Sequence, residues 1–199
     1  MKFLFFSLAA LFCFTACNNN MKPKATEMEA KKIPVILAEP VTYTGDSITM
    51  DGFVAYDSAL QGKLPVVMII HEWWGLNDYT KSRAKQLADL GYLAMAVDLY
   101  GNGINGNNPE EATKLATPFY TNPLTAQKRF DAALEKIKTF PQADTSKIAA
   151  IGYCFGGSMV LNLAALGENL KAVVSFHAGL RTVPAEKNTL KAKILVCHG

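Results

Sequence analysis

Short continuous apolar runs recur along this 199-residue chain, separated by segments with helical spacing. The runs are Val66–Ile70, Tyr92–Val97, Lys147–Ile151, Leu170–Phe176 and Lys193–Cys197. Runs of this length between turn residues are typical of strands that are buried on both faces. Buried strands that alternate with helices indicate a mostly parallel sheet with helices on both faces, so the sequence predicts an α/β fold.

The segments between the runs predict the covering helices and one further strand pair. Helices are expected over 78–90, where Gly91 ends the pattern, over 124–140, with Phe130, Ala133, Leu134 and Ile137 inward, and over 158–166. Residues 41–56 carry turn signals at 44–46 and at Asp51-Gly52, which predict a strand pair at the sheet edge. Three Gly and four Asn make 101–108 a loop.

Composition excludes several classes of protein. Half of the residues are hydrophobic and 19% are charged, which is typical of a globular chain. The formal net charge of +3 comes without a Lys/Arg stripe or interleaved aromatic residues, so no nucleic-acid partner is expected. No metal-ligand spacing and no dinucleotide fingerprint is present, so no metal and no cofactor is implied.

The first residues differ in character from the rest. Lys2, the apolar run 3–14 and Thr15-Ala16-Cys17 have the parts of a secretory signal peptide over residues 1–16. The run is shorter than the about 20 residues that span a bilayer, although a transmembrane anchor is the alternative. Phe14-Thr15-Ala16-Cys17 resembles a bacterial lipoprotein signal, except that Leu is usual where Phe14 stands. The resemblance implies that Cys17 is lipidated, that 17–40 is a tether, and that the exported protein is anchored to a bacterial membrane.

The segment most informative about chemistry is Gly152-Tyr153-Cys154-Phe155-Gly156, placed where a buried strand turns into a helix. A nucleophile elbow has this pattern because its central residue is strained and the neighbouring glycines let the backbones pass closely. The helix start would stabilise a thiolate and a developing oxyanion. The alternatives are that Cys154 is a small buried hydrophobic residue, a redox-active thiol, or the disulfide partner of Cys197.

A second segment, His71-Glu72-Trp73-Trp74-Gly75, follows the first buried run. In α/β-hydrolases the loop at this place supplies one N–H group of the oxyanion hole. We therefore expect the N–H groups of Trp73 and Phe155 to form that hole. The alternative for the tryptophan side chains is plain core or pocket lining.

With these two segments in place, the chain resembles the dienelactone hydrolase family. The matching pieces, in the family's order, are 71–78, Gly91-Tyr92 with 98–101, 152–157, Ser175-Phe176-His177 and 196–199. The resemblance implies an α/β-hydrolase domain over 41–199 that hydrolyses a carboxylic ester or lactone through a thioester on Cys154. It also implies that Glu72 approaches the thiol and helps to form the thiolate. A solvated loop carboxylate is the alternative for Glu72.

Two departures from the family pattern limit the functional prediction. The family's Asp and His lie beyond the strand that ends at Cys197, so we expect a chain truncated at its C-terminus and inactive as it stands. His177 and His198 are interpreted as structural residues at strand ends. The family's substrate-holding Arg is missing from 101–120, where Lys114 is the only cation, which favours a neutral or bulkier ester. The main rival is a lipoprotein that binds a ligand in a hydrolase pocket without catalysis.

Overall fold

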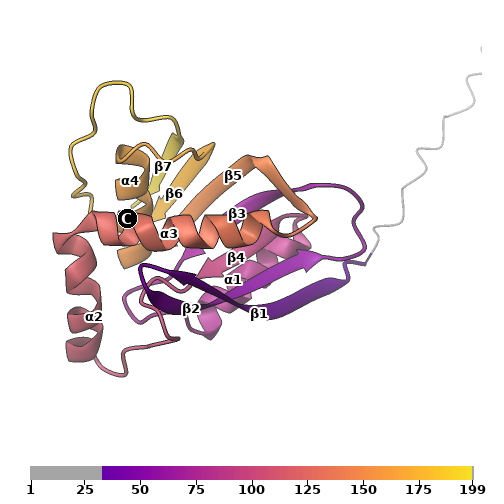
Figure 1. The fold of residues 1–199 in the computed structure, drawn as a ribbon, viewed down its shortest axis with the longest axis horizontal. Helices are drawn as coiled ribbons and strands as arrows, with labels where there is room; N and C mark the ends of the chain where they lie inside the picture. The colour runs from indigo at the N-terminus through magenta and orange to yellow at the C-terminus, as the bar shows by residue number, and fades with distance from the viewer. Residues whose placement is uncertain (1–32, 199) are drawn as a thin grey trace, which may run out of the picture. The chain divides into compact units, whose positions relative to one another are not determined.

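The computed structural model describes residues 33–198, which contain one sheet of seven strands in the order β1-β2-β4-β3-β5-β6-β7 (Figure 1). The strands are β1 Ile36–Gly45, β2 Ile48–Asp57, β3 Leu64–Ile70, β4 Leu93–Val97, β5 Ala143–Tyr153, β6 Ala172–Phe176 and β7 Lys193–Cys197. Neighbours from β4 to β7 pair in parallel, whereas β1–β2 and β2–β4 are antiparallel. The predicted mostly parallel sheet with a strand pair at its edge is therefore confirmed.

Four helices cover the sheet in this part of the chain: α1 Asp78–Asp89, α2 Pro109–Thr121, α3 Pro123–Lys138 and α4 Phe155–Ala165. Successive side chains of a strand point to opposite faces, so β3 contributes to two cores. Val67 and Ile69 pack with Ala84 of α1, whereas Met68 belongs to the larger core with Phe130 of α3. Helices therefore lie on both faces, and α3 crosses the near one in Figure 1.

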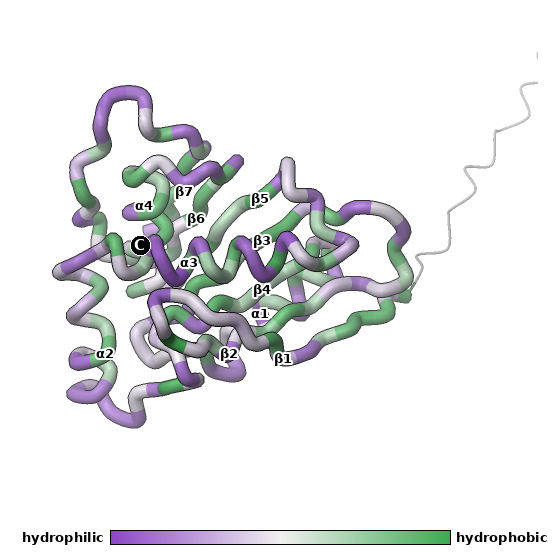
Figure 2. The backbone as a smooth tube through the Cα atoms, in the orientation of Figure 1, coloured by the Kyte–Doolittle hydropathy of each residue, from purple (hydrophilic) through white to green (hydrophobic). Residues whose placement is uncertain are grey.

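Helix α3 shows how the sequence sets this packing. Its predicted inward residues Phe130, Ala133, Leu134 and Ile137 are all buried. Figure 2 shows hydrophobic and hydrophilic positions alternating along α3, while the central strands are hydrophobic. Helix α4 differs, because all of its residues are buried. It is thus held rigidly against the sheet directly after Cys154.

Two local expectations are wrong, and one helix was missed. Strand β1 begins at Ile36, so the folded domain starts before residue 41, and the end of the predicted tether is strand. The reason is a ladder of ten residue pairs with β2, which overrides the weak local pattern. Asp51-Gly52 lies inside β2 and is not a turn, because both residues pair with β1, opposite Thr42 and Val41. Helix α2 was not predicted.

The signal peptide at 1–16, the lipid site Cys17 and most of the tether lie outside the described residues. Within 33–198, no helix is both long enough and apolar enough to cross a membrane. Cys154 and Cys197 are both free thiols, so the alternative of a disulfide between them is wrong.

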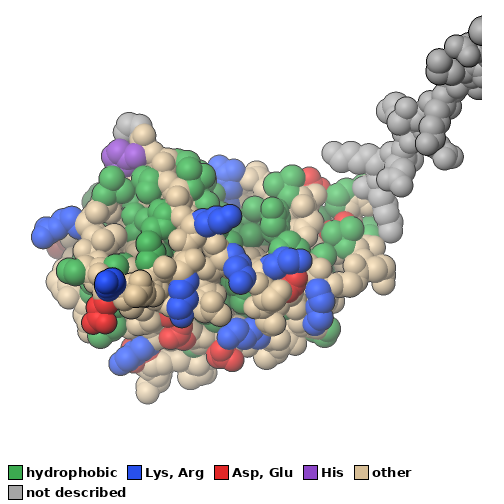
Figure 3. All heavy atoms as spheres, turned by 90° about the horizontal axis from the view of Figure 1, so that it is seen from above, with side chains coloured by type: hydrophobic (Ala, Val, Ile, Leu, Met, Phe, Trp, Pro, Cys, Tyr) green, Lys and Arg blue, Asp and Glu red, His purple; other side chains and the backbone are tan. Residues whose placement is uncertain are grey.

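The edge strand β7 exposes apolar side chains. Ile194, Leu195 and Val196 are 45%, 56% and 41% exposed, although the strand pairs with β6 along one side. Figure 3 shows hydrophobic side chains gathered in patches on the face that is seen from above. Exposed apolar strands are usually covered by another element or a partner.

Candidate active site

Cys154 is the single residue between the end of β5 at Tyr153 and the start of α4 at Phe155. Its backbone has φ 52° and ψ −111°, a conformation that residues other than glycine rarely adopt. Such strain persists only where the surroundings impose it, and it is concentrated at functional sites. The strand–Cys–helix arrangement that the sequence predicted is present, and the helix begins directly after the cysteine.

The two glycines that flank Cys154 are required by close backbone contacts. A Cβ atom on Gly152 would overlap the carbonyl of Gly156. One on Gly156 would overlap the carbonyl oxygens of Ile70 and His71. The first turn of α4 therefore lies against the end of β3, which brings the loop 71–75 beside the elbow.

His71 fixes this loop from inside the protein. Its ring is fully buried, with Nδ1 against the carbonyl oxygen of Glu72 and Nε2 accepting the N–H of Leu99 at 3.3 Å. It also packs against the rings of Tyr100 and Phe155, with centroids 4.7 and 5.8 Å away. Burial lowers the pKa of His71 to about 4, so the ring is neutral near pH 7. His71 is thus a structural residue that connects the loop 71–75, the segment 99–100 after β4 and the first residue of α4.

Two backbone N–H groups are left open at the elbow. Within residues 33–198, neither the N–H of Trp73 nor that of Phe155 has a hydrogen-bond acceptor. Other hydrogen bonds fix the loop around Trp73. The Tyr100 hydroxyl donates to the carbonyl oxygen of Trp73 at 2.8 Å, and the N–H of Gly75 donates to the carbonyl oxygen of Glu72 at 3.3 Å. Unpaired N–H groups at a helix start and in a fixed loop are what an oxyanion requires.

The carboxylate of Glu72 lies beside His177, with Oε1 3.4 Å from Nε2. Sequence reasoning did not foresee this pair, because it joins residues 105 positions apart through the sheet order. No side chain in 33–198 makes a hydrogen bond to Sγ of Cys154. The structure therefore places Glu72 at the same edge as the thiol, but with His177 as its partner.

Two phenols lie close enough to Cys154 to interact with it electrostatically. Burial, together with the neighbouring cysteine, raises the pKa of Tyr100 and of Tyr120. Both hydroxyls therefore remain protonated at neutral pH. Tyr120 comes from α2, the unpredicted helix, although Asn108 as N-cap, Pro109 and the acidic first turn are ordinary helix-start signals.

Buried Asp98 shapes the loop behind Tyr100. Its carboxylate accepts the N–H groups of Gly101 at 2.8 Å and of Gly103 and Asp51 at 3.0 Å each. Arg129 of α3 supports the same segment by donating to the carbonyls of Leu99 and Tyr100. The loop 98–103 is thus anchored on both sides.

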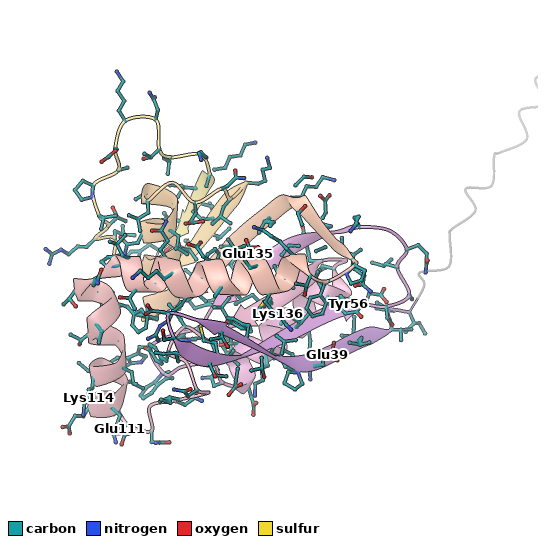
Figure 4. The ribbon with its side chains drawn as sticks, in the orientation of Figure 1. Glu39, Tyr56, Glu111, Lys114, Glu135 and Lys136 are labelled. Atoms are coloured by element: carbon teal, nitrogen blue, oxygen red, sulfur yellow. The ribbon has the colours of Figure 1, made fainter. Side chains whose placement is uncertain are left out.

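A cavity of about 450 Å³ lies between this loop and α2, and Tyr100 forms part of its wall. The lining is largely apolar, and cavities of this size commonly hold small organic ligands. Glu111 and Lys114, both on α2, add charge to it (Figure 4). The lining residues are Tyr100, Ile104, Asn105, Glu111, Lys114, Leu115, Pro118, Phe119, Thr125 and Arg129.

A strained residue between a central parallel strand and a buried helix, opposite a loop with open N–H groups, is the arrangement found at the nucleophile elbow of α/β-hydrolases. The model of the dienelactone hydrolase family matches residues 50–199. The chain therefore belongs to the dienelactone hydrolase family. Its fold agrees with this assignment, as the sequence predicted.

Individual relatives agree with the family assignment. The solved structure named m3DLH is 35% identical with a TM-score of 0.78, covering 82% of this chain and 69% of its own. A dienelactone hydrolase-like promiscuous phosphotriesterase from metagenomic libraries is 35% identical with a TM-score of 0.76, at the same coverage. A protein of Aquifex aeolicus (strain VF5) that bears the name of a carboxymethylenebutenolidase is 34% identical over 118 residues, 57% of this chain. The chain spans about half the length of such curated relatives, 51% in this case.

Proposed function

We propose that this protein hydrolyses carboxylic esters or lactones, with Cys154 as the nucleophile. The single observation that carries the proposal is the strained backbone of Cys154 at the start of α4. A cysteine that only filled space would not need a positive φ, because packing can be achieved without strain. The alternative of a plain buried residue is thereby disfavoured.

In the proposed reaction the thiolate attacks the ester carbonyl and forms a tetrahedral intermediate. The N–H groups of Trp73 and Phe155 would receive its oxyanion, and collapse of the intermediate would release the alcohol and leave a thioester. Water then hydrolyses the thioester. The cavity beside Tyr100 has room for the apolar part of a small substrate, but Cys154 is not among its lining residues, so this placement rests on the electrostatic interaction of Tyr100 with Cys154.

We further propose that the general base and its acid follow Cys197, as the resemblance to the family implies. Coverage of 69% of the solved relative and the exposed apolar side chains of β7 support a continuation of the fold. The lipoprotein anchor at Cys17 and the export of the protein to a membrane surface also remain proposals, which rest on residues 14–17 of the sequence.

Turnover of p-nitrophenyl acetate and of a small lactone tests the hydrolase proposal. The full-length protein should hydrolyse at least one of them, and Cys154→Ala should abolish turnover, because no other group in the site can form the thioester. Cys197→Ala, on the neighbouring edge strand, is the matched control and should retain activity. Turnover that survives Cys154→Ala would overturn the proposal, and no turnover by wild type would favour the ligand-binding lipoprotein.

A further inference from the structure

The Glu72–His177 pair spans the end of the strand that carries Cys154. Glu72 follows β3 and His177 follows β6, and β5 lies between these two strands in the sheet. Neighbouring strands are about 4.8 Å apart, so the ends of β3 and β6 are separated by about 10 Å. A side-chain contact of 3.4 Å between them must therefore pass over the end of β5.

The position of His177 is coupled directly to the elbow. The carbonyl of Phe176 accepts the N–H of Cys154 at 2.9 Å, and the N–H of His177 donates to Cys197 O at 2.8 Å. His177 also has a positive φ of 42°, so the residues that follow β5 and β6 both depart from ordinary strand geometry. Because Tyr153 of β5 pairs with Phe176 of β6, Cys154 and His177 are the next residues after a paired position on two neighbouring strands.

The imidazole has one nitrogen available for a proton. Nε2 faces the Glu72 carboxylate, and Nδ1 makes no hydrogen bond within residues 33–198. A neutral imidazole with its proton on Nε2 leaves the lone pair of Nδ1 free. The His177 side chain is 56% exposed and that of Glu72 28%, and their contact lets the carboxylate orient the imidazole, as the third group does in a nucleophile–base–carboxylate arrangement.

We propose that His177 takes the proton from the Cys154 thiol, and that Glu72 stabilises the imidazolium that forms. The S–H bond breaks, the proton moves to Nδ1 of His177, and the electron pair stays on Sγ. This role rests on the proposed function of Cys154. It differs from the role of the base expected beyond Cys197, because it concerns only formation of the thiolate. It also replaces the interpretation of His177 as a purely structural residue.

Other titratable groups around the pair leave this assignment intact. On β5, Tyr153 faces Glu72, and burial raises the pKa of its phenol, so it stays neutral. Arg83 of α1 stacks over the Tyr153 ring at 5.9 Å and is a constant positive charge. On the β7 side lie the partly buried thiol of Cys197 and the exposed His198.

The test measures the rate of Cys154 alkylation by iodoacetamide, site by site by peptide mass spectrometry, between about pH 5.5 and 9.5. In wild type, the midpoint of the pH profile should lie at least about one unit below the value near 8.5 of a free thiol. His177→Gln should raise the midpoint by about one unit, which lowers the rate near pH 6.5 about tenfold. Glu72→Gln should act in the same direction, and the double variant should add little.

His198→Gln is the matched control, because it removes an exposed imidazole that follows the next strand. Its profile should overlie that of wild type, and thermal melts establish that each variant is folded. A wild-type profile at the free-thiol midpoint, or no change in His177→Gln, would overturn the role of His177 while leaving the hydrolase proposal intact. A Cys154 that resists alkylation at every pH, while Cys197 reacts, would overturn both.

Discussion

The strain at Cys154 predicts that glycine is the more stable replacement at this position. Glycine normally destabilises relative to alanine, because it loses more backbone freedom on folding. At Cys154 the Cβ atom of alanine would keep the conformation with φ 52° unfavourable, whereas glycine would relieve it. Both replacements remove the sulfur atom, so their difference isolates the backbone strain.

The size of the difference follows from two opposing effects. A residue other than glycine in a sparsely populated backbone region costs roughly 1–3 kcal/mol. The entropic disadvantage of glycine is about 0.5–1 kcal/mol. Cys154→Gly should therefore exceed Cys154→Ala by about 1 kcal/mol in free energy of unfolding, which corresponds to roughly 2–4 °C in Tm for a chain of this size.

Urea denaturation followed by circular dichroism measures this difference. The same two replacements at Cys197, which lies in strand β7 without positive φ, provide the control. There the order should reverse, with alanine about 0.5–1 kcal/mol more stable than glycine. Alanine equal to or more stable than glycine at position 154 would refute the argument that the elbow is strained.

Three further variants test other parts of the account. Gly156→Ala should lower the free energy of unfolding, measured by urea denaturation, by roughly 3 kcal/mol, because the added Cβ would overlap two carbonyl oxygens and cannot rotate away. A change below about 0.5 kcal/mol would contradict this. Asp98→Ala should cost roughly 2–4 kcal/mol in the same assay, since three N–H groups lose their acceptor, and a neutral result would contradict it. Burial of neutral His71 lowers its pKa to about 4, so the unfolded chain binds the proton first as the pH falls. The contribution of neutral His71 to the free energy of unfolding is complete above about pH 6.5 and declines by about 3 kcal/mol toward pH 4. The free energy of unfolding of His71→Gln should therefore depend less steeply on pH than that of wild type, and a curve parallel to wild type would contradict this.

The elements that the sequence predicted well are those whose signals are local. Strand β7 begins and ends at the residues expected, and the inward face of α3 was predicted correctly from its spacing. The elbow could be predicted because strand, Gly-x-Cys-x-Gly and helix are contiguous in the sequence. Local geometry that is set by residues close together in the sequence can be predicted without knowledge of the tertiary fold.

The features that the sequence did not reveal depend on contacts between distant segments. Helix α2 contains Pro118 and many polar residues, and its burial against the rest of the protein is confined to a few side chains such as Phe119. Leu90 fits the apolar face of α1 by spacing, yet it is 71% exposed, because the helix ends before it. The Glu72–His177 pair depends on β5 lying between β3 and β6, an order that periodicity does not determine.

The most direct test of Cys154 as nucleophile is intact mass spectrometry of the full-length protein, quenched with acid during hydrolysis of p-nitrophenyl acetate. We expect an added acetyl group that maps to Cys154 and is absent from Cys154→Ala. In Cys154→Ser the adduct should form far more slowly, because a serine hydroxyl is a weaker nucleophile without its own base. Turnover without any adduct, or an acetyl group on another residue that is required for turnover, would contradict the account.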